Sequence, residues 1–210
     1  MKYKTIFFLI LVVSLSSCAS GNVSWDENGD LNIDGNIYHY DHELSSGWNL
    51  EGSLIEVGYT FSLHGKTSFF KSELDNNVNV VEDIRSFLYF KQDFVFPDIF
   101  KTNIITFTIG EPYSLEKPRD FEKKYNFKDH FGSVALNDIM VPFLEDLTIN
   151  SNTVSETYFV SVIYENYEYL SYTALNLYVI NDVYYFENVY TEDKYIVTEK
   201  YVHLFDCILP

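Results

Sequence analysis

Apolar and polar side chains alternate along residues 54–63. Ile55, Val57, Tyr59, Phe61 and Leu63 fall on one side of the alternation, and Glu56, Gly58, Thr60 and Ser62 fall on the other. Successive side chains of a β-strand point to opposite faces, so this period of two predicts a strand with one buried and one solvated face. Residues 64–66 are expected to turn the chain, and residues 67–71 to return as the antiparallel partner.

A small meander is predicted ahead of this hairpin. Asn-Gly and Asp-Gly pairs are strong signals for two-residue hairpin turns. They stand at residues 28–29 and 34–35, and they predict three strands, the third of which covers residues 36–42. The remaining predictions for this half are a polar loop at residues 72–83 and strands at residues 85–91 and 103–109.

The C-terminal part of the chain is rich in β-branched and aromatic residues, which are typical of strands. Four segments carry this bias, and Asn181–Asp182 predicts a tight turn between the second and the third. The segments are residues 157–166, 168–180, 183–187 and 194–199. Several have apolar side chains on both faces, so we expect a sheet that is covered on both sides or has an aromatic outer face.

Residues 111–146 hold most of the helical signal. Proline is tolerated in the first turn of a helix, where its missing N–H has no helical partner. Pro118 therefore predicts a helix start, followed by Phe121 and Tyr125 four residues apart on one face. Pro142 predicts the start of a second short helix that runs through Leu147.

These elements together predict an α+β fold, mostly antiparallel β-sheet with a short helical middle section. Residues 25–210 are long enough to bury a core as one domain, and a sub-boundary near residue 110 is the alternative. Cys18 and Cys207 are the only cysteines. Cys207 stands in an apolar stretch, where its simplest interpretation is a small core residue.

The N-terminus has the pattern of a secretory signal peptide. Lys2 and Lys4 form a positive start, and an apolar run from Ile6 to Val13 extends to Leu15 with one serine between. A membrane-spanning helix needs roughly 20 apolar residues, so this run is too short to remain as a span. The alternative is a buried N-terminal helix or strand.

The end of the apolar run, Leu15-Ser16-Ser17-Cys18, resembles the lipobox of bacterial lipoproteins. The resemblance implies a diacylglyceryl group on the Cys18 thiol and cleavage before Cys18, so that residues 1–17 are removed and residues 18–24 form a tether. Two acyl chains anchor a protein stably to a bilayer. The implied location is extracytoplasmic, on the cell membrane or the outer membrane. The alternative is an ordinary secreted protein that is cut nearby.

The chain is strongly acidic, with a formal net charge of −17 at pH 7. Cleavage before Cys18 removes Lys2 and Lys4, which leaves 193 residues and a formal charge of −19. A surface of this sign repels nucleic acids and anionic lipid headgroups, so we expect no nucleic-acid partner. Acylation of Cys18 would also leave Cys207 without an intramolecular disulfide partner.

Residues 30–41 fit the ligand spacing of a twelve-residue calcium loop. Asp30, Asn32 and Asp34 place oxygens at positions one, three and five, Gly35 is at position six and Asp41 at position twelve. The segment is similar to the calcium loops of EF-hand and dockerin modules, which implies a Ca²⁺ site. It departs from them in having Asp at position twelve and no expected flanking helix. The alternative is a plain β-hairpin, which needs the same Asp-Gly turn.

Other candidates for chemistry are poorly placed. His39 and Asp41 would share one face of a strand, while His42 would point to the other, so no transition-metal site is expected. Cys207 and His203 would stand roughly 13 Å apart along a strand, which is too far for a Cys–His dyad. The sequence has no Gly-x-Ser-x-Gly elbow and no His-Glu-x-x-His zinc helix. We therefore assign no catalytic residue and no cofactor.

Eleven of the 18 tyrosines lie between Tyr158 and Tyr201. Tyrosine stabilises sheets by pairing across strands and is also favoured at binding faces, so this sheet is either an aromatic core or a surface that binds sugars or proteins. The first hypothesis is a non-enzymatic, lipid-anchored module that binds an envelope protein, a peptide or a wall glycan. The alternatives are a hydrolase that acts on the envelope and a calcium-binding envelope protein that uses residues 30–41.

Overall fold

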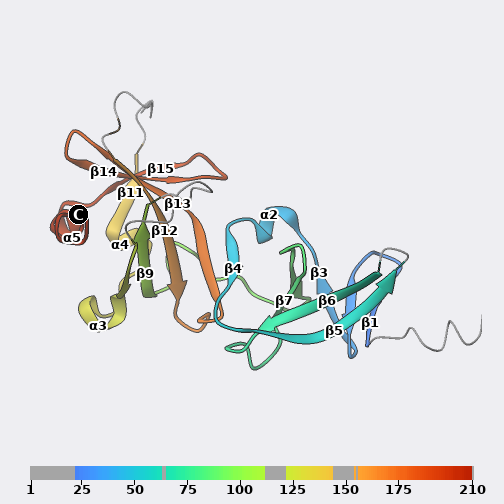
Figure 1. The fold of residues 1–210 in the computed structure, drawn as a ribbon. Coiled ribbons are helices and arrows are strands. Elements are labelled where there is room, and N and C mark those ends of the chain that lie inside the picture. Colours follow the sequence, from blue (N-terminus) through green and yellow to red (C-terminus); the bar gives the residue numbers. More distant parts are fainter. Residues whose placement is uncertain (1–21, 63–64, 112–121, 144–153, 155, 210) are drawn as a thin grey trace, which may run out of the picture. The chain divides into compact units, whose positions relative to one another are not determined.

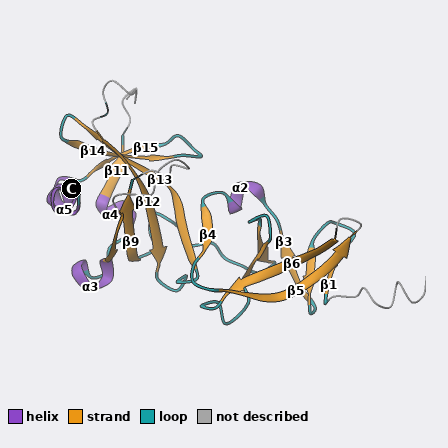
Figure 2. Cartoon of the chain, in the orientation of Figure 1, coloured by secondary structure: helices purple, strands orange, loops and turns teal. Residues whose placement is uncertain are grey.

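The computed structural model describes residues 22–62, 65–111, 122–143, 154 and 156–209. Strands account for 52 % of these described residues and helices for 13 %, which confirms the predicted α+β, mostly antiparallel class (Figures 1 and 2). The chain divides into two compact units. Among the described residues, the first unit comprises 22–45 and 52–94, and the second comprises 46–51 and those from residue 95 onward.

The first unit is a seven-stranded antiparallel sheet with the strand order β1-β2-β3-β8-β7-β6-β5. The predicted strand at residues 54–63 and its partner are confirmed as β5 and β6. The Asp34–Gly35 turn is also confirmed, because both residues have positive φ, 51° and 85°. The elements are β1 (Val23–Trp25), β2 (Leu31–Ile33), β3 (Asn36–His39), α2 (His42–Ser45), β5 (Leu54–Ser62), β6 (Gly65–Ser72), β7 (Val80–Asp83) and β8 (Leu88–Lys91).

Three predictions for this unit had wrong bounds, and each time an aspartate caps the backbone. β3 ends at His39 because Asp41 accepts the Glu43 N–H at 2.9 Å and begins α2. The predicted loop at residues 72–83 ends early, since the buried Asp75 carboxylate accepts the N–H groups of Asn79 at 2.6 Å and of Val80, the first residue of β7, at 3.0 Å. The strand predicted at residues 85–91 begins only at Leu88, because Asp83 organises a turn before it.

The two end strands of this sheet lie against each other. The Asn22 side-chain amide donates to the Val57 carbonyl at 2.9 Å. A Cβ atom at Gly58 would lie 2.4 Å from Cγ2 of Val23, so the close approach of β1 to β5 requires glycine there. The sheet therefore curls around one apolar core. That core consists of Val23, Leu31, Ile33, Tyr38, Phe69, Val81 and Tyr89.

The second unit is an eight-stranded antiparallel sheet with the order β10-β9-β12-β13-β14-β15-β11, and β4 pairs with β13. The four predicted C-terminal strands are confirmed, and so is the Asn181–Asp182 turn, whose φ angles are 51° and 61°. The elements are β4 (Trp48–Leu50), β9 (Ile104–Gly110), β10 (Glu122–Asn126), α3 (Phe127–Phe131), α4 (Leu136–Ile139), β11 (Met140–Pro142), β12 (Glu156–Tyr164), β13 (Leu170–Ile180), β14 (Val183–Asn188), β15 (Lys194–Val197) and α5 (Glu199–Ile208).

The short helical section predicted within residues 111–146 is present as α3 and α4, but the positions predicted for its helices were wrong where the structure describes them. Tyr125 lies in β10, opposite Phe107 of β9, and Pro142 ends strand β11 instead of starting a helix. Pro118, Phe121 and Leu147 lie outside the described residues.

Helix α5 was not predicted. It buries Tyr201, Phe205 and Ile208 along one face at spacings of four and three residues, and Phe205 packs on Phe107 with ring centroids 6.1 Å apart. Cys207 falls off this face and is exposed, so its prediction as a core residue was wrong.

Candidate functional site

The residues of the predicted calcium loop form the β2–β3 hairpin. Asp30 lies 2.7 Å from Nδ1 of His39, Asn32 accepts the Gly35 N–H at 3.0 Å, and Asp34 accepts from the Asn22 amide at 3.1 Å. These oxygens are therefore engaged along the hairpin, while Asp41 caps α2. Within the described ranges, no group of three or more His, Cys, Asp and Glu side chains is placed to hold a metal ion.

The tyrosines of the second unit are mostly core residues. Among those that the structure describes, only Tyr190 is strongly exposed, at 59 %. A sheet whose tyrosines point inward stabilises the fold but offers little aromatic surface to a ligand. The buried members are Tyr158, Tyr164, Tyr169, Tyr172, Tyr184, Tyr195 and Tyr201.

Helix α5 brings together the Cys207 and His203 pair that a strand would have separated. Cys207 Sγ lies 3.9 Å from His203 Nε2, and His203 Nδ1 lies 4.0 Å from the Asp206 carboxylate. The Tyr184 hydroxyl donates to Asp206 at 2.7 Å. We call Cys207, His203 and Asp206 the α5 row. A cavity of about 400 Å³ lies beside it, and its lining residues are Phe131, Lys200, Tyr201, His203, Leu204 and Cys207.

The row has the residue types of a nucleophile, a base and an orienting acid, but its geometry does not activate the thiol. Both separations are at the outer limit of an interaction. Cys207 stands in the last turn of α5, where the helix dipole disfavours a thiolate. The His203 side chain is 88 % exposed, so water competes for its nitrogens. We assign no catalytic step to these residues.

Three of the four strongly exposed aromatic residues among the described residues of the first unit share packing partners, and the fourth, Phe61, lies in β5 and packs on Tyr59. Trp25 ends β1, Tyr40 follows β3 and Phe87 precedes β8, and we call these three residues the aromatic rim. Their exposed fractions are 45 %, 41 % and 40 %. Large aromatic side chains left this exposed at one place are typical of binding surfaces.

Buried aromatic rings pack against the aromatic rim. Trp25 and Tyr40 pack on Tyr89 with centroid distances of 5.8 Å and 5.6 Å, and Trp25 also contacts Phe69 at 6.1 Å. Tyr40 and Phe87 lie 5.3 Å apart. Because each exposed ring rests on another ring, the rim is held in one arrangement before any ligand arrives.

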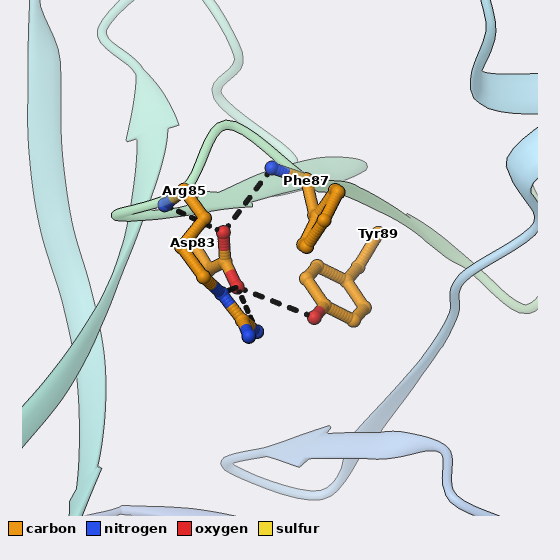
Figure 3. Close-up of polar contacts among 4 residues, drawn as sticks. All are labelled: Asp83, Arg85, Phe87 and Tyr89. Carbon is orange, nitrogen blue, oxygen red and sulfur yellow. Dashed lines mark hydrogen bonds and ion pairs between the residues drawn. The ribbon is translucent and has the colours of Figure 1, made fainter. Parts of the chain in front are cut away.

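A buried carboxylate fixes the turn that carries Phe87 (Figure 3). Oδ1 of Asp83 accepts the backbone N–H groups of Arg85 at 2.8 Å and Phe87 at 3.1 Å. Oδ2 accepts hydrogen bonds from Nε and Nη2 of Arg85 at 3.0 Å and 2.7 Å, and from the Tyr89 hydroxyl at 3.5 Å. The Asp83 side chain is fully buried, while the Arg85 guanidinium reaches solvent and lies 5.0 Å from the centroid of Phe87.

These contacts set the charges at the rim. Burial, and then the charge of Asp83, raises the pKa of Tyr89 to about 12, so its hydroxyl stays protonated at neutral pH. The hydrogen bonds and charge of Asp83 raise the pKa of Arg85. Next to Trp25, backbone N–H groups, first that of Asp30, lower the pKa of Asp26 and keep it ionised. The rim therefore combines apolar faces with fixed charges of both signs.

A scan against protein-family models and searches of curated proteins and of solved structures found no match to this chain. None of the helices in the described parts of the chain is long and apolar enough to span a membrane.

The sequence placed Phe87 within the strand predicted at residues 85–91, and it placed the candidate binding surface in the C-terminal sheet. No local pattern links residues 25, 40 and 87, because they meet only through the pairing of β1, β2, β3 and β8. The one available signal was that Trp25 and Tyr40 stand on either side of the two turns of the predicted meander.

Proposed function

We propose that this chain is a lipid-anchored, extracytoplasmic binding module, without catalytic activity of its own, that uses the aromatic rim as its binding surface. The lipobox-like segment ending at Cys18 supports the anchor. The exposed and preorganised rings of Trp25, Tyr40 and Phe87 support the binding surface, and this is the observation on which the proposal depends. The partner is expected to be another component of the cell envelope.

A hydrolase that acts on the envelope is the second candidate. The cavity beside α5 and the row of Cys207, His203 and Asp206 favour it. The exposure of His203 and the position of Cys207 at the end of its helix weigh against it, for the reasons given above. Binding at the rim therefore remains the function that the geometry supports best.

The anchor predicts a cysteine-specific label. Full-length protein made in bacteria fed labelled palmitate is expected to carry the label and to sediment with membranes, while Cys18→Ser carries none and becomes soluble, because it lacks the acyl chains. Cys207→Ser is the matched control, since it changes the only other cysteine, and it should keep the label. Label on Cys18→Ser, or label lost from Cys207→Ser, would contradict the anchor.

The rim predicts a loss of binding without a loss of folding. We expect Tyr40→Ser and Phe87→Ser each to reduce retention of the full-length protein by immobilised envelope components about tenfold, because central aromatic residues dominate binding energies. Tyr190→Ser is the control, since it removes a still more exposed tyrosine from the second unit. The urea midpoints of all three variants serve to check folding. Equal retention of all variants would contradict the proposal.

A further inference from the structure

Helices α3 and α5 border a cavity in the second unit. Phe127 of α3 and Phe205 of α5 both pack on Phe107 of β9, with ring centroids 5.6 Å and 6.1 Å from it. The cavity of about 400 Å³ described above is lined by Phe131 of α3 and by residues of α5. Its volume is within the range of pockets that take small ligands. The packing of both helices on one core residue therefore fixes the walls of the cavity.

Three side chains make up the apolar part of this cavity. Phe131 is 41 % exposed, and Phe127 holds its ring in place with the two centroids 4.7 Å apart. Leu204 is partly buried, and Tyr201 is buried. An apolar group placed here would remove the exposed face of Phe131 from water, which is favourable in proportion to the area covered.

The charged part of the cavity comes from one stripe of α5. Lys200 and His203 stand three residues apart, so they share a face of the helix, and Cys207 follows four residues later on the same face. The two acids of α5, Glu199 and Asp206, are not among the residues that line the cavity. The described lining therefore contains the positive charge of Lys200 and no carboxylate.

Tyr201 holds the Lys200 ammonium at the cavity. Nζ of Lys200 donates to the Tyr201 hydroxyl at 3.2 Å and lies 4.8 Å from the centroid of the Tyr201 ring. The Tyr201 oxygen accepts this hydrogen bond, and no described residue accepts its O–H in turn. Nor does any described carboxylate pair with Lys200. An ammonium and a hydroxyl with protons left to donate form a binding site for a carboxylate.

We infer that the cavity between α3 and α5 binds a small carboxylic acid with an apolar body. Its carboxylate accepts hydrogen bonds from Lys200 and Tyr201, and its body covers Phe131 and Leu204. One cation suits a ligand with a single negative charge, whereas the net charge of −17 repels polyanions. The site goes beyond the proposed function, because it lies in the second unit and shares no residue with the aromatic rim.

A matched pair of ligands tests the inference on the full-length Cys18→Ser protein, in which Cys207 is the only thiol. The probe is 2-naphthoate, and 2-naphthamide is its neutral counterpart of the same shape. Their dissociation constants are measured by ligand-observed nuclear magnetic resonance. We expect saturable binding of 2-naphthoate and at least about tenfold weaker binding of 2-naphthamide, because only the carboxylate forms charge-assisted hydrogen bonds. Equal affinities, or no binding of 2-naphthoate at millimolar concentration, overturn the inference.

Variants of the two donors separate their contributions. Lys200→Gln is expected to weaken 2-naphthoate binding about tenfold and Tyr201→Phe about fivefold, because the first removes a charged donor and the second a neutral one. Lys101→Gln is the matched control, since it makes the same change at an exposed lysine of the second unit that pairs with Asp98 at 2.9 Å and does not line the cavity. Urea midpoints check folding. Equal affinities of Lys200→Gln and Lys101→Gln overturn the inference.

Cys207 reports where the ligand binds, because its thiol lines the cavity and is exposed. Alkylation by iodoacetamide, an uncharged reagent, is followed by mass spectrometry. A saturating concentration of 2-naphthoate is expected to slow it at least about fivefold. The same concentration should protect Lys200→Gln much less. Saturable binding of 2-naphthoate that leaves the alkylation rate of Cys207 unchanged would place the ligand elsewhere and overturn the inference.

Discussion

Asp83→Ala is expected to lower the free energy of unfolding of the first unit by about 3–5 kcal/mol. The Asp83 side chain is fully buried, and it holds two backbone N–H groups, the Arg85 guanidinium and the Tyr89 hydroxyl together. Alanine would leave the Arg85 and Phe87 N–H groups without their acceptor and open a gap beside the Tyr89 hydroxyl. The loss should therefore exceed that of any exposed ion pair in the chain.

Urea unfolding of the full-length protein measures this effect, followed by Trp25 fluorescence in a Trp48→Phe background so that only the first unit is observed. Glu56→Ala is the control, because Glu56 lies in the same unit and pairs with Lys66 at 2.8 Å, but is exposed. It should leave the midpoint nearly unchanged. Asp83→Asn, which keeps one acceptor oxygen, is expected to fall between the two. A loss under about 1 kcal/mol for Asp83→Ala would show that the turn forms without its carboxylate.

Asp83, together with Asp75, shows why the predicted bounds of some strands and loops were wrong. Alternation and turn pairs located β5, β6 and the Asp34–Gly35 hairpin because these signals act between neighbouring residues. Asp75 and Asp83 instead bind backbone groups up to five residues away, at 3.0 Å for Val80 and 3.1 Å for Phe87, and so decide where a loop ends or a strand begins. That choice depends on whether the carboxylate is buried, which a local pattern does not record.

The sequence analysis did not predict helix α5 or strand β10, and the reason is a different one. Tyr201, Phe205 and Ile208 are as typical of strands as of helices, and only the core of the second unit selects their spacing of three to four residues. Tyr125 was equally ambiguous until its pairing opposite Phe107 placed it in β10. The rim could not be located from the sequence, because the contacts of Trp25 and Tyr40 with Tyr89 form only when the strands pair. Prediction from sequence therefore succeeded for local elements and failed where tertiary structure decided.

Alkaline pH is expected to destabilise both units over a narrow range. Burial is the first cause that raises the pKa of Tyr38 and Tyr89 in the first unit, and of Tyr184 and Tyr195 in the second, each to about 12 from an ordinary value of 10. Neighbouring carboxylates add to the shift, Asp83 at Tyr89 and Asp206 at Tyr184. In the folded protein these hydroxyls resist ionisation because a phenolate would be buried beside an acid.

The direction of the effect follows from proton binding. Below pH 10 the tyrosines are protonated in both states, so their contribution to stability is fully present. Between pH 10 and 12 the unfolded chain releases these protons while the folded chain keeps them, so stability falls as pH rises. Each tyrosine lowers the free energy of unfolding by less than about 1.4 kcal/mol per pH unit, since solvent screening reduces the shift at partly exposed phenols.

Urea unfolding of the full-length protein at successive pH values from 9 to 12 measures this loss, and the ultraviolet absorbance of tyrosinate shows whether the hydroxyls ionise only as the chain unfolds. Tyr184→Phe is expected to make the fall in stability of the second unit less steep. It removes one hydroxyl that ionises in the unfolded chain but stays protonated in the folded chain. Tyr190→Phe, at an exposed position, should leave the slope unchanged. A free energy of unfolding that stays level from pH 10 to 12, or tyrosinate absorbance that rises near pH 10 while the protein remains folded, would show that these hydroxyls ionise in the folded chain.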